Sequence, residues 1–364
     1  YPMIIDRNSP VPQYFQLQNW IMEQITQGVY KQGDKIPTEK EFSEITGLAR
    51  ATIRQAINNI VNKGYLDRKK RLGTFVIYKK EVAHKSNFIG VIVPDIRRGY
   101  APELARGIED EAVNKKLSTL LCNSDDLYVQ ADFHADRLIE NSVSGVIFIP
   151  TAASDAKNRL ILEKFQRNDI PVVLADRNVA GVEYDWVTTD NYDGAYKITS
   201  YLIKNGKKRI GIILNSLFST EKLRLDGYKQ ALLDHDIEID ESIILANQGP
   251  FNETRCLQSA NALLHVVPPV TAIFAGHDRI AYQVKSAARS LMLDIPTDVA
   301  LVGYDDLLLS RSQNHGITTM HQPIYEMGVE SMKLLLERIE NKLEKPKTIT
   351  LKSHLVERTS VNIK

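Results

Sequence analysis

The 364-residue chain has little cysteine, no long apolar run and almost no net charge. Two cysteines, Cys122 and Cys256, exclude a small disulfide-stapled protein and suit a reducing cytoplasm. Apolar residues make up 43% and charged residues 25% of the chain, which excludes a disordered or collagen-like protein. Apolar runs such as Ile210 to Leu214 are far shorter than the ~20 residues of a membrane span. The composition therefore indicates a cytoplasmic globular protein with two or three domains.

The signatures of several other classes are missing as well. No basic start followed by an apolar stretch and a small-residue cleavage site opens the sequence, so we expect no secretory signal. The chain contains no G-x-S-x-G, H-E-x-x-H or Walker motif, and no Cys/His spacing that suggests a metal. No lysine stands in a context that suggests a Schiff base. We therefore expect a protein that is not an enzyme and that needs neither a cofactor nor a metal.

The near-zero net charge is the sum of two unequal parts. The 46 Lys+Arg and 45 Asp+Glu give +1, which by itself argues against a nucleic-acid partner. Residues 1–87, however, carry 14 basic and 8 acidic side chains, a charge of +6, and the remainder carries −5. Such asymmetry points to a polyanion-binding module joined to a different unit. We therefore expect DNA contacts to be confined to residues 1–87.

The first half of this basic region predicts two helices. Pro12 suits the first turn of a helix that ends at Gly28. Its buried face would consist of apolar residues at three- and four-residue spacing, namely Tyr14, Leu17, Ile21 and Ile25. Thr38 and Glu41 form a T-x-x-E capping box, which predicts a second helix at about 39–46.

A third helix and a hairpin follow. The helix begins near Arg50 and would expose Thr52, Arg54 and Gln55. Because the turn at Gly47 is tight, the second and third helices predict a helix-turn-helix, whose second helix can enter the major groove of DNA. Residues 65–77 predict a hairpin with four cations, 68–71, at its tip. The alternative is a three-helix bundle with solvated charge, but here the cations gather where a winged helix meets phosphates.

This region resembles the winged helix of the GntR family of bacterial regulators. The resemblance covers about residues 11–77, and its motifs are Pro12-Gln13-Tyr14, Ile36-Pro37-Thr38-Glu39, Thr52-Ile53-Arg54-Gln55-Ala56, Gly64-Tyr65-Leu66 and Gly73-Thr74-Phe75-Val76. It implies that Arg50 reads bases. The other DNA contacts that it implies, to phosphates or groove edges, are Tyr14, Lys40, Thr52, Arg54, Gln55, Lys69, Lys70, Arg71, Gly73 and Thr74.

Two positions depart from the family's pattern. A Ser or Thr usually precedes the arginine that opens the recognition helix, and this chain has Ala49 there. The missing N-cap hydroxyl costs ~1 kcal/mol of helix stability and removes a phosphate donor. Arg71 stands where the family's wing usually has glycine, which adds a cation and alters the path of the wing.

Residues 78–87 are polar and aperiodic, and they predict a linker. From Phe88 onward, apolar runs alternate with helical stretches, as is typical of parallel sheets covered on both faces. The runs are 88–94, 117–122, 145–150, 171–176, 209–214, 271–275 and 299–304, and the helical stretches include 101–116, 193–205, 221–235 and 278–292. Residues 88–364 are long for one sheet, so we expect an α/β unit of two doubly wound parallel sheets facing each other across a cleft.

Three aspartates, Asp95, Asp176 and Asp305, stand at or just after the ends of apolar runs. Ligands of open α/β sheets bind outside this carboxyl edge, where carboxylates can accept hydroxyl hydrogen bonds. Arg224 opens a helix near the same edge, and a buried arginine without a partner would be costly. The alternative is that such aspartates cap the next helix, which we weigh most strongly for Asp95 and Asp278.

Residues 88–364 resemble the effector domain of the LacI/GalR repressors, which is related to periplasmic sugar-binding proteins. The matching segments are 89–94, 145–147, Asp190-Asn191, Gly194-Ala195, 224–228, Asp278 with Ala281, 302–306 and 318–323. The resemblance implies two lobes joined by crossovers near 190, 320 and 345. Lobe 1 would span about 88–190 and 320–345, and lobe 2 about 191–319 and 346–364, after a winged helix-turn-helix domain at 1–77 and a linker at 78–87.

The same resemblance implies a set of ligand residues. Arg224 and Asp305 would hold the effector from two sides, and Phe251 would stack on it, unless that ring belongs to the core. His277 stands where the family usually has Asn, so the effector's identity is open at this position. The full set is Arg98, Tyr100, Asp176, Arg224, Phe251, His277 and Asp305.

The combination resembles arabinose-repressor-type bacterial regulators. It implies a repressor that binds an inverted-repeat operator as a homodimer and releases it when a sugar or sugar-like effector fills the cleft. The alternatives are a solute-binding protein for sugar uptake and a sugar-acting enzyme with a DNA-binding head. The +6 charge of residues 1–87 argues against the first, and the missing catalytic motifs argue against the second.

Overall fold

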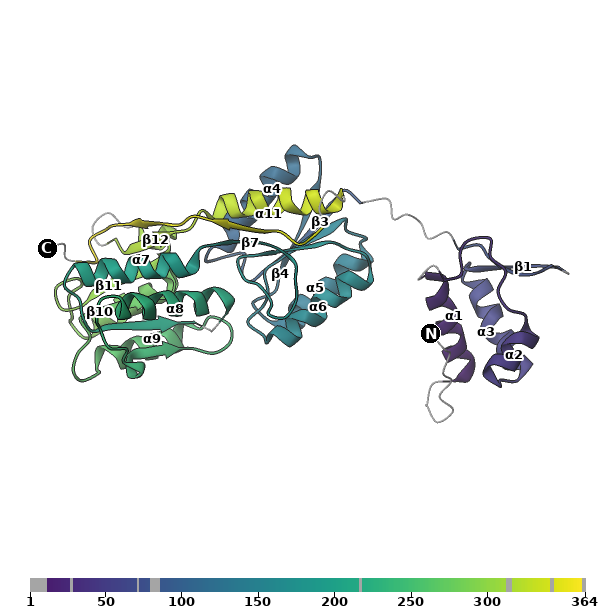
Figure 1. Cartoon of the computed structure of the whole chain (residues 1–364), viewed down its shortest axis with the longest axis horizontal. Helices are drawn as coiled ribbons and strands as arrows, with labels where there is room; N and C mark the ends of the chain where they lie inside the picture. Colours follow the sequence, from purple (N-terminus) through teal and green to yellow (C-terminus); the bar gives the residue numbers. More distant parts are fainter. Residues whose placement is uncertain are drawn as a thin grey trace. The chain divides into compact units, whose positions relative to one another are not determined.

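The computed structural model describes residues 12–26, 29–70, 72–78, 86–215, 218–311, 316–340 and 344–361. The chain forms two compact units, residues 1–85 (the head) and residues 86–364 (the body), and each is described by itself (Figure 1). Within the described ranges, no helix is both long and apolar enough to cross a membrane.

Within its described residues, the head consists of three helices and one antiparallel hairpin. Its elements are α1 (Gln13–Thr26), α2 (Glu39–Thr46), α3 (Arg50–Asn62), β1 (Leu66–Lys69) and β2 (Gly73–Val76). Its core is separate from those of the body and is formed by Leu17, Ile21, Ile25, Ile36, Phe42, Leu48, Ile53, Ala56, Ile57, Ile60, Leu66 and Val76. Leu66 pairs with Val76 and Lys69 with Gly73, so the hairpin ends at the predicted cationic tip.

The helix ends of the head follow the chemistry of the sequence. The Thr38 hydroxyl accepts the Glu41 N–H at 3.3 Å, and the Glu41 carboxylate accepts the Thr38 N–H at 2.7 Å, which confirms the capping box. Gly47 ends α2 in the left-handed region, with φ of 66°. Ala49 is the N-cap residue of α3 and makes no side-chain hydrogen bond, so no hydroxyl stabilises the start of this helix.

The body contains two six-stranded sheets, each covered by helices on both faces. In lobe 1 the strand order is β13-β7-β6-β5-β3-β4, and all strand pairs are parallel. The strands are β3 (Phe88–Val93), β4 (Ser118–Asn123), β5 (Gly145–Phe148), β6 (Val172–Ala175), β7 (Asp185–Thr189) and β13 (Thr348–Leu351). One face packs against α4 (Ala101–Asn114) and α11 (Ile324–Ile339), and the other against α5 (Tyr128–Glu140) and α6 (Asp155–Arg167).

Lobe 2 repeats this plan with one antiparallel edge. Its strand order is β14-β12-β11-β10-β8-β9, and the β12–β14 pair is antiparallel whereas the other described pairs are parallel. The strands are β8 (Ile210–Leu214), β9 (Ile244–Ala246), β10 (Ala272–Ala275), β11 (Ala300–Asp305), β12 (Thr318–His321) and β14 (His354–Val356). One face packs against α7 (Asn191–Lys204) and α8 (Ser219–Leu233), and the other against α9 (Glu253–Leu264) and α10 (Asp278–Ser290).

The third crossover lies later than the sequence predicted. We expected it near 345, with 346–364 in lobe 2. Strand β13 instead pairs with β7 at the edge of the lobe 1 sheet, and the chain enters lobe 2 only between Leu351 and His354. The first two crossovers, at Asp190 and at Gln322, lie where we expected them. The strand was missed because an exposed edge strand such as β13 lacks the continuous apolar run of a buried one.

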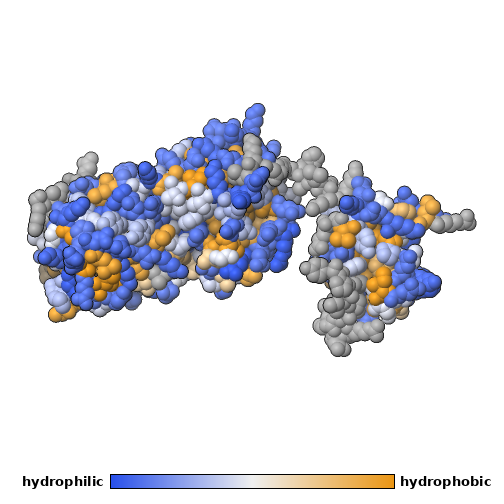
Figure 2. All heavy atoms as spheres, viewed as in Figure 1, coloured by the Kyte–Doolittle hydropathy of each residue, from blue (hydrophilic) through white to orange (hydrophobic). Residues whose placement is uncertain are grey.

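Glycines bring one helix pair in each lobe into close contact. A Cβ atom on Gly107 of α4 would lie 2.1 Å from the carbonyl oxygen of Tyr325, and one on Gly328 of α11 would lie 2.2 Å from that of Leu104. In lobe 2 a Cβ atom on Gly227 of α8 would lie 2.2 Å from the carbonyl oxygen of Tyr192 in α7. Figure 1 shows α4 lying beside α11 and α7 beside α8. In the view of Figure 2 the body's surface is mainly hydrophilic, with small scattered apolar patches.

Candidate functional site

The exposed face of α3 carries the predicted recognition residues. Arg50, Arg54 and Gln55 are exposed, and Thr52 is partly exposed. Arg54 is held by Glu39 of α2 through Nε and Nη2, at 2.9–3.3 Å. Its position is therefore fixed before it meets any DNA.

The wing is tied to the same carboxylate. Arg68 of β1 donates to Glu39 at 3.1 Å, so one acidic residue links the hairpin to the recognition helix. Lys69 Nζ lies 5.2 Å from the centre of the Phe75 ring, and Lys70 is exposed. Gly73 adopts φ of 121°, which favours glycine at this turn. Arg71, the predicted fourth tip cation, lies outside the described residues.

The remaining predicted DNA contacts occupy different environments. Lys40 is exposed and lies 3.9 Å from Glu44. Thr74 lies in β2, where its carbonyl oxygen accepts the Ile36 N–H. Tyr14 is only partly exposed and packs against the core of the head, so burial restricts its access to DNA. The DNA-contact role of each of these residues remains a prediction.

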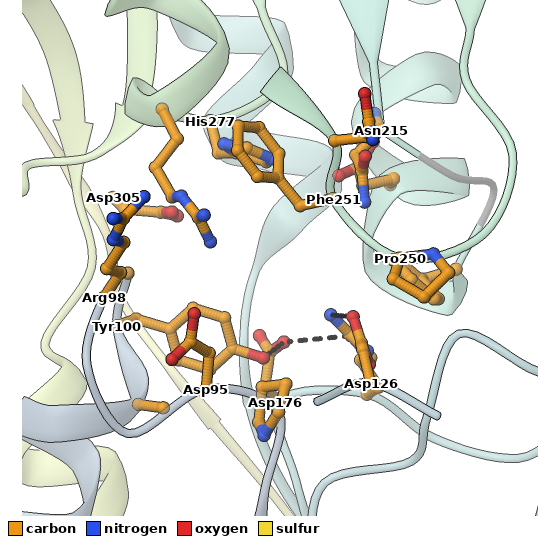
Figure 3. Close-up of a pocket in the computed structure, with 18 of the residues that line it drawn as sticks. Asp95, Arg98, Tyr100, Asp126, Asp176, Asn215, Pro250, Phe251, His277 and Asp305 are labelled. Carbon is orange, nitrogen blue, oxygen red and sulfur yellow. Dashed lines mark hydrogen bonds and ion pairs between the residues drawn. The ribbon is translucent and has the colours of Figure 1, made fainter. Parts of the chain in front are cut away.

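The body contains a polar cavity of about 490 Å³, where the carboxyl ends of strands from both lobes meet. All seven predicted ligand residues line it: Arg98, Tyr100, Asp176, Arg224, Phe251, His277 and Asp305. Figure 3 labels six of them, all except Arg224. Their common location agrees with the rule for open α/β sheets. Their roles in ligand binding remain predictions.

Arg224 has the partners that its burial requires. It is 4% exposed, and its guanidinium lies 3.8 Å from the centre of the Tyr304 ring. Nε donates to the side-chain oxygen of Asn191 at 2.8 Å, and Nη1 donates to the carbonyl oxygen of Gly276 at 2.6 Å. Nη2 lies 3.6 Å from Asp305 Oδ1. A guanidinium fixed in this way is pre-organised to donate hydrogen bonds from the cavity wall.

The two aspartates predicted to bind the ligand, Asp305 and Asp176, are also held in place by hydrogen bonds. Burial raises the pKa of Asp305 to about 8, against the lowering effect of Arg224. Its Oδ1 accepts a hydrogen bond from Nε2 of Gln322 at 2.6 Å. On the lobe 1 side, the Tyr100 hydroxyl donates to Asp176 Oδ2 at 2.8 Å. The cavity therefore presents buried carboxyl groups from both lobes, since Asp126 of lobe 1 and Glu221 of lobe 2 also line it.

Phe251 lies between a histidine and an arginine. The guanidinium of Arg279 lies 3.8 Å from the centre of the Phe251 ring, and the His277 ring lies 5.3 Å from it. Burial lowers the pKa of His277 well below its usual value, and the nearby arginines lower it further. His277 is therefore neutral at pH 7 and able both to accept and to donate a hydrogen bond.

Direct contacts join the lobes at the rim of the cavity. Arg98 of lobe 1 pairs with Glu253 of lobe 2 at 2.8 Å, and both side chains are more than half exposed. The N–H of Asn178 donates to the hydroxyl of Ser219 at 2.9 Å. Because these contacts need the lobes to be close, they stabilise a closed arrangement of the body.

Asp278 is the first residue of α10, but its carboxylate does not cap that helix and instead binds three groups elsewhere in lobe 2. Asp278 is fully buried, and its carboxylate accepts hydrogen bonds from the Leu307 N–H at 2.7 Å, from the Thr319 hydroxyl at 2.8 Å and from the Ser310 hydroxyl. It therefore braces lobe 2 below the cavity. Asp95 accepts a hydrogen bond from the backbone N–H of Arg97, which precedes α4, so it does not cap that helix, and it lines the cavity.

The sequence reasoning missed a buried ion pair in the cavity wall. Arg177 pairs with Asp126 at 2.6 Å, and both residues are buried. The Arg177 guanidinium also lies 3.7 Å from the centre of the Phe218 ring, which belongs to lobe 2. Arg177 directly follows Asp176 at the end of β6, and this position was the available signal.

A winged helix with an exposed cationic face, on the same chain as a two-lobed unit with an interlobe polar cavity, defines an effector-responsive DNA-binding regulator. The family comparisons agree with this class. Residues 13–76 match the model of the bacterial regulatory proteins of the gntR family, and residues 199–361 match that of the periplasmic binding protein-like domain.

The chain belongs to the HTH-type transcriptional regulators. It is 32% identical over 320 residues to the probable HTH-type transcriptional regulator EndR of Paenibacillus polymyxa, which covers 84% of this chain and 92% of that one. It is 27% identical over 365 residues to the arabinose metabolism transcriptional repressor of Geobacillus stearothermophilus, which covers 97% and 99%. Because such regulators are a non-enzymatic class, the protein is a transcriptional regulator and not an enzyme or an uptake protein.

Solved structures show the same body fold. The LacI family transcriptional regulator from Enterococcus faecium, determined with bound ribose, has a TM-score of 0.66 and 26% identity, and covers 75% of this chain and 98% of that one. The transcription regulator CcpA of Lactococcus lactis has a TM-score of 0.70 and 25% identity, and covers 76% and 100%.

Proposed function

We propose that the protein is a repressor that binds an inverted-repeat operator as a homodimer and releases it when an uncharged monosaccharide binds the interlobe cavity. The observation that carries the proposal is the composition of the cavity wall, where the paired Arg224 and Asp305 of lobe 2 lie across from Tyr100 and Asp176 of lobe 1. Such a regulator acts in the cytoplasm, where the operator DNA is.

The charges of the cavity favour an uncharged ligand. Seven carboxyl groups and five arginines line it. Four of the arginines already lie beside lining carboxylates, as the pairs Arg97–Asp95, Arg98–Glu253, Arg177–Asp126 and Arg224–Asp305. The cavity has no surplus of positive charge to offset a phosphate or a sugar acid. Carboxylates and guanidinium groups instead match the hydroxyl groups of a neutral sugar.

We take pentoses as the first candidates, and the names of two similar proteins support this choice. The Geobacillus stearothermophilus relative is named as an arabinose metabolism repressor, and the Enterococcus faecium structure holds ribose. A thermal-shift panel of L-arabinose, D-ribose, D-xylose and D-glucose, with D-ribose 5-phosphate and D-gluconate as charged probes, tests the ligand class. At 100 times its Kd, a specific sugar stabilises the protein by ~2.7 kcal/mol.

Arg224→Ala is the matched control for this panel. The variant should lose the thermal shift while its affinity for operator DNA stays within about twofold, because the head has its own core. Stabilisation by a charged probe alone would contradict the uncharged class and leave the regulator intact. A panel with no stabilising sugar would contradict the sugar effector itself.

The homodimer is a separate part of the proposal. An inverted repeat presents the same half-site twice, related by a twofold axis, so two copies of the head are needed to fill it. Sedimentation of the 41.2-kDa chain at micromolar concentration should show a species of twice this mass. A monomer that binds the full operator with one protein per duplex would contradict this assignment.

A further inference from the structure

A ring of four buried hydrogen bonds and one close arginine–aspartate contact connects the cavity to two of the three interlobe crossovers. The first crossover lies between Thr189, at the end of β7, and Asn191, at the start of α7. The second contains Gln322, between β12 and α11. The ring joins these three residues to Arg224 and Asp305, which line the cavity.

Each link of the ring is a defined contact. The Thr189 hydroxyl donates to Oε1 of Gln322, and Nε2 of Gln322 donates to Asp305 Oδ1 at 2.6 Å. Asp305 Oδ1 lies 3.6 Å from Nη2 of Arg224, whose Nε donates to Asn191 Oδ1 at 2.8 Å. Nδ2 of Asn191 closes the ring by donating to the carbonyl oxygen of Thr189 at 3.0 Å.

Burial makes the ring sensitive to a change at any one of its members. All five residues are at most 5% exposed. A buried polar group that loses its partner has no water to replace it, so the groups of such a network rearrange together. A sugar hydroxyl that bonds to Arg224 or Asp305 competes with ring contacts and thereby acts on Asn191 and Gln322.

The members belong to segments that must move differently when the lobes rotate. Thr189 ends a strand of lobe 1, Asn191 begins a helix of lobe 2, and Gln322 links a lobe 2 strand to a lobe 1 helix. The ring therefore contains atoms on both sides of two hinges. A ligand shifts a conformational equilibrium only through contacts that differ between the two states.

We infer that this ring transmits effector binding to the crossovers, and that Thr189 and Gln322 are positioning residues for the response and not for sugar affinity. The inference rests on the proposed function, because it needs a sugar that binds the cavity and weakens operator binding. It also gives a role to the polar side chain of Gln322 at a crossover position that is 3% exposed.

Thr189→Val gives the sharpest test, because valine keeps the shape of threonine and cuts the ring at a point away from both cavity-lining members. The operator is a duplex selected by the wild-type protein from a random-sequence pool, and the sugars are L-arabinose, D-ribose, D-xylose and D-glucose. Fluorescence anisotropy of the labelled operator gives its Kd without sugar and at a sugar concentration that saturates each variant. The ratio of the two Kd values is the response factor.

The response factor of the wild type should lie within about 5–150-fold. Thr189→Val should reduce it at least about threefold while the sugar Kd from calorimetry changes less than about threefold. Gln322→Met, which removes both of its ring bonds, should reduce the factor as well. Thr199→Val is the matched control, because Thr199 is also fully buried but its hydroxyl donates to Ala195 within α7, and this variant should keep the wild-type factor.

The two failures are distinguishable. If Thr189→Val and Gln322→Met keep the full response factor at saturation and only weaken sugar binding, the ring merely holds the ligand residues, and the inference is wrong. The inference is also wrong if Thr199→Val lowers the factor as much as Thr189→Val does. A wild-type protein that responds to none of the four sugars contradicts the proposed function, and the inference falls with it.

Discussion

Glu39 organises the cationic face of the head at the scale of single side chains. It holds Arg54 on the recognition helix and Arg68 on the wing, and the hydrogen bond from Arg54 contributes most to lowering its pKa. Arg50 lies on the same exposed face, in the first turn of α3. Arg54 and Arg68 are therefore partly neutralised, which leaves Arg50 as the cation best suited to read bases.

Arg50→Ala should weaken operator binding by ~1–3 kcal/mol and relax the sequence preference, since the predicted base contact would be lost. Lys63→Ala, which removes one exposed cation at the end of the same helix, should have a smaller effect that disappears at higher salt. Gel-shift titrations at two salt concentrations compare the variants. Equal losses for both variants would mean that Arg50 acts only through its charge.

The buried Asp305 makes stability depend on pH. Its pKa is about 8 in the folded protein because burial disfavours the charged form, and Asp278 and Asp176 raise it further, whereas Arg224 and Gln322 lower it. Because the folded value lies above the unfolded one, this contribution to stability is complete at low pH and is lost as pH rises through about 8.

Between pH 6.5 and 8.5 the wild type should lose about 2 kcal/mol of stability through this residue. Asp305→Asn removes the ionisation, so its free energy of unfolding should be flatter over the same window. Urea titrations at four pH values measure the difference. A wild type and a variant with parallel pH profiles would show that Asp305 is ionised throughout.

The sequence predicted the ligand residues that line the cavity, but not the residues that pair with one another around them. Arg224 and Asp305 lie in motifs that resemble a known family, and both line the cavity. Asp126 and Arg177 belong to no recognisable motif. They are 51 residues apart in the sequence and come together only when the strands assemble into the sheet. The contacts of Thr189 with Gln322 likewise depend on how the crossovers meet.

At the scale of elements, both lobes use the same device to pack a helix pair. Gly107 and Gly328 let α4 and α11 touch through their backbones, and Gly227 does the same for α8 against α7. Among the edge strands of the two sheets, β9, β13 and β14 were not predicted from the sequence, because they have three or four residues each and are partly exposed. The edge strand β4 was predicted as the run 117–122. The central strands β3, β5, β6, β8, β10 and β11 were predictable from their apolar runs, whereas the interior strands β7 and β12, which are rich in threonine, were not.

Gly227→Ala should destabilise the body by ~1–3 kcal/mol, because the new Cβ atom would lie 2.2 Å from a backbone oxygen that cannot rotate away. Lys222→Ala, on the exposed side of the same helix, should change stability by less than about 0.5 kcal/mol. Thermal denaturation of the body measures both variants. A Gly227→Ala protein as stable as the wild type would show that α7 and α8 can move apart freely.

At the scale of the whole molecule, the head and the body have separate cores and opposite charges. No member of the head's core cluster belongs to the body. The charge of +6 on residues 1–87 and of −5 on the remainder assigns the attraction for DNA to the head.

Separate fragments should therefore keep separate activities. Residues 1–85 should bind operator DNA more weakly than the full chain, with affinity that falls steeply with salt. Residues 86–364 should bind no DNA but should show the thermal shift of the full chain with the same sugar. Binding of DNA by the second fragment would place part of the interface on the acidic body.

The late third crossover has a consequence for synthesis on the ribosome. The head is complete by residue 78, whereas the lobe 1 sheet receives its last strand, β13, only at Leu351. At about 5–20 residues per second, this interval lasts roughly 15–55 s. During this interval the nascent chain has a complete DNA-binding head, while the lobe 1 sheet of the body still lacks its edge strand β13. The DNA-binding domain can therefore fold before the effector-binding domain.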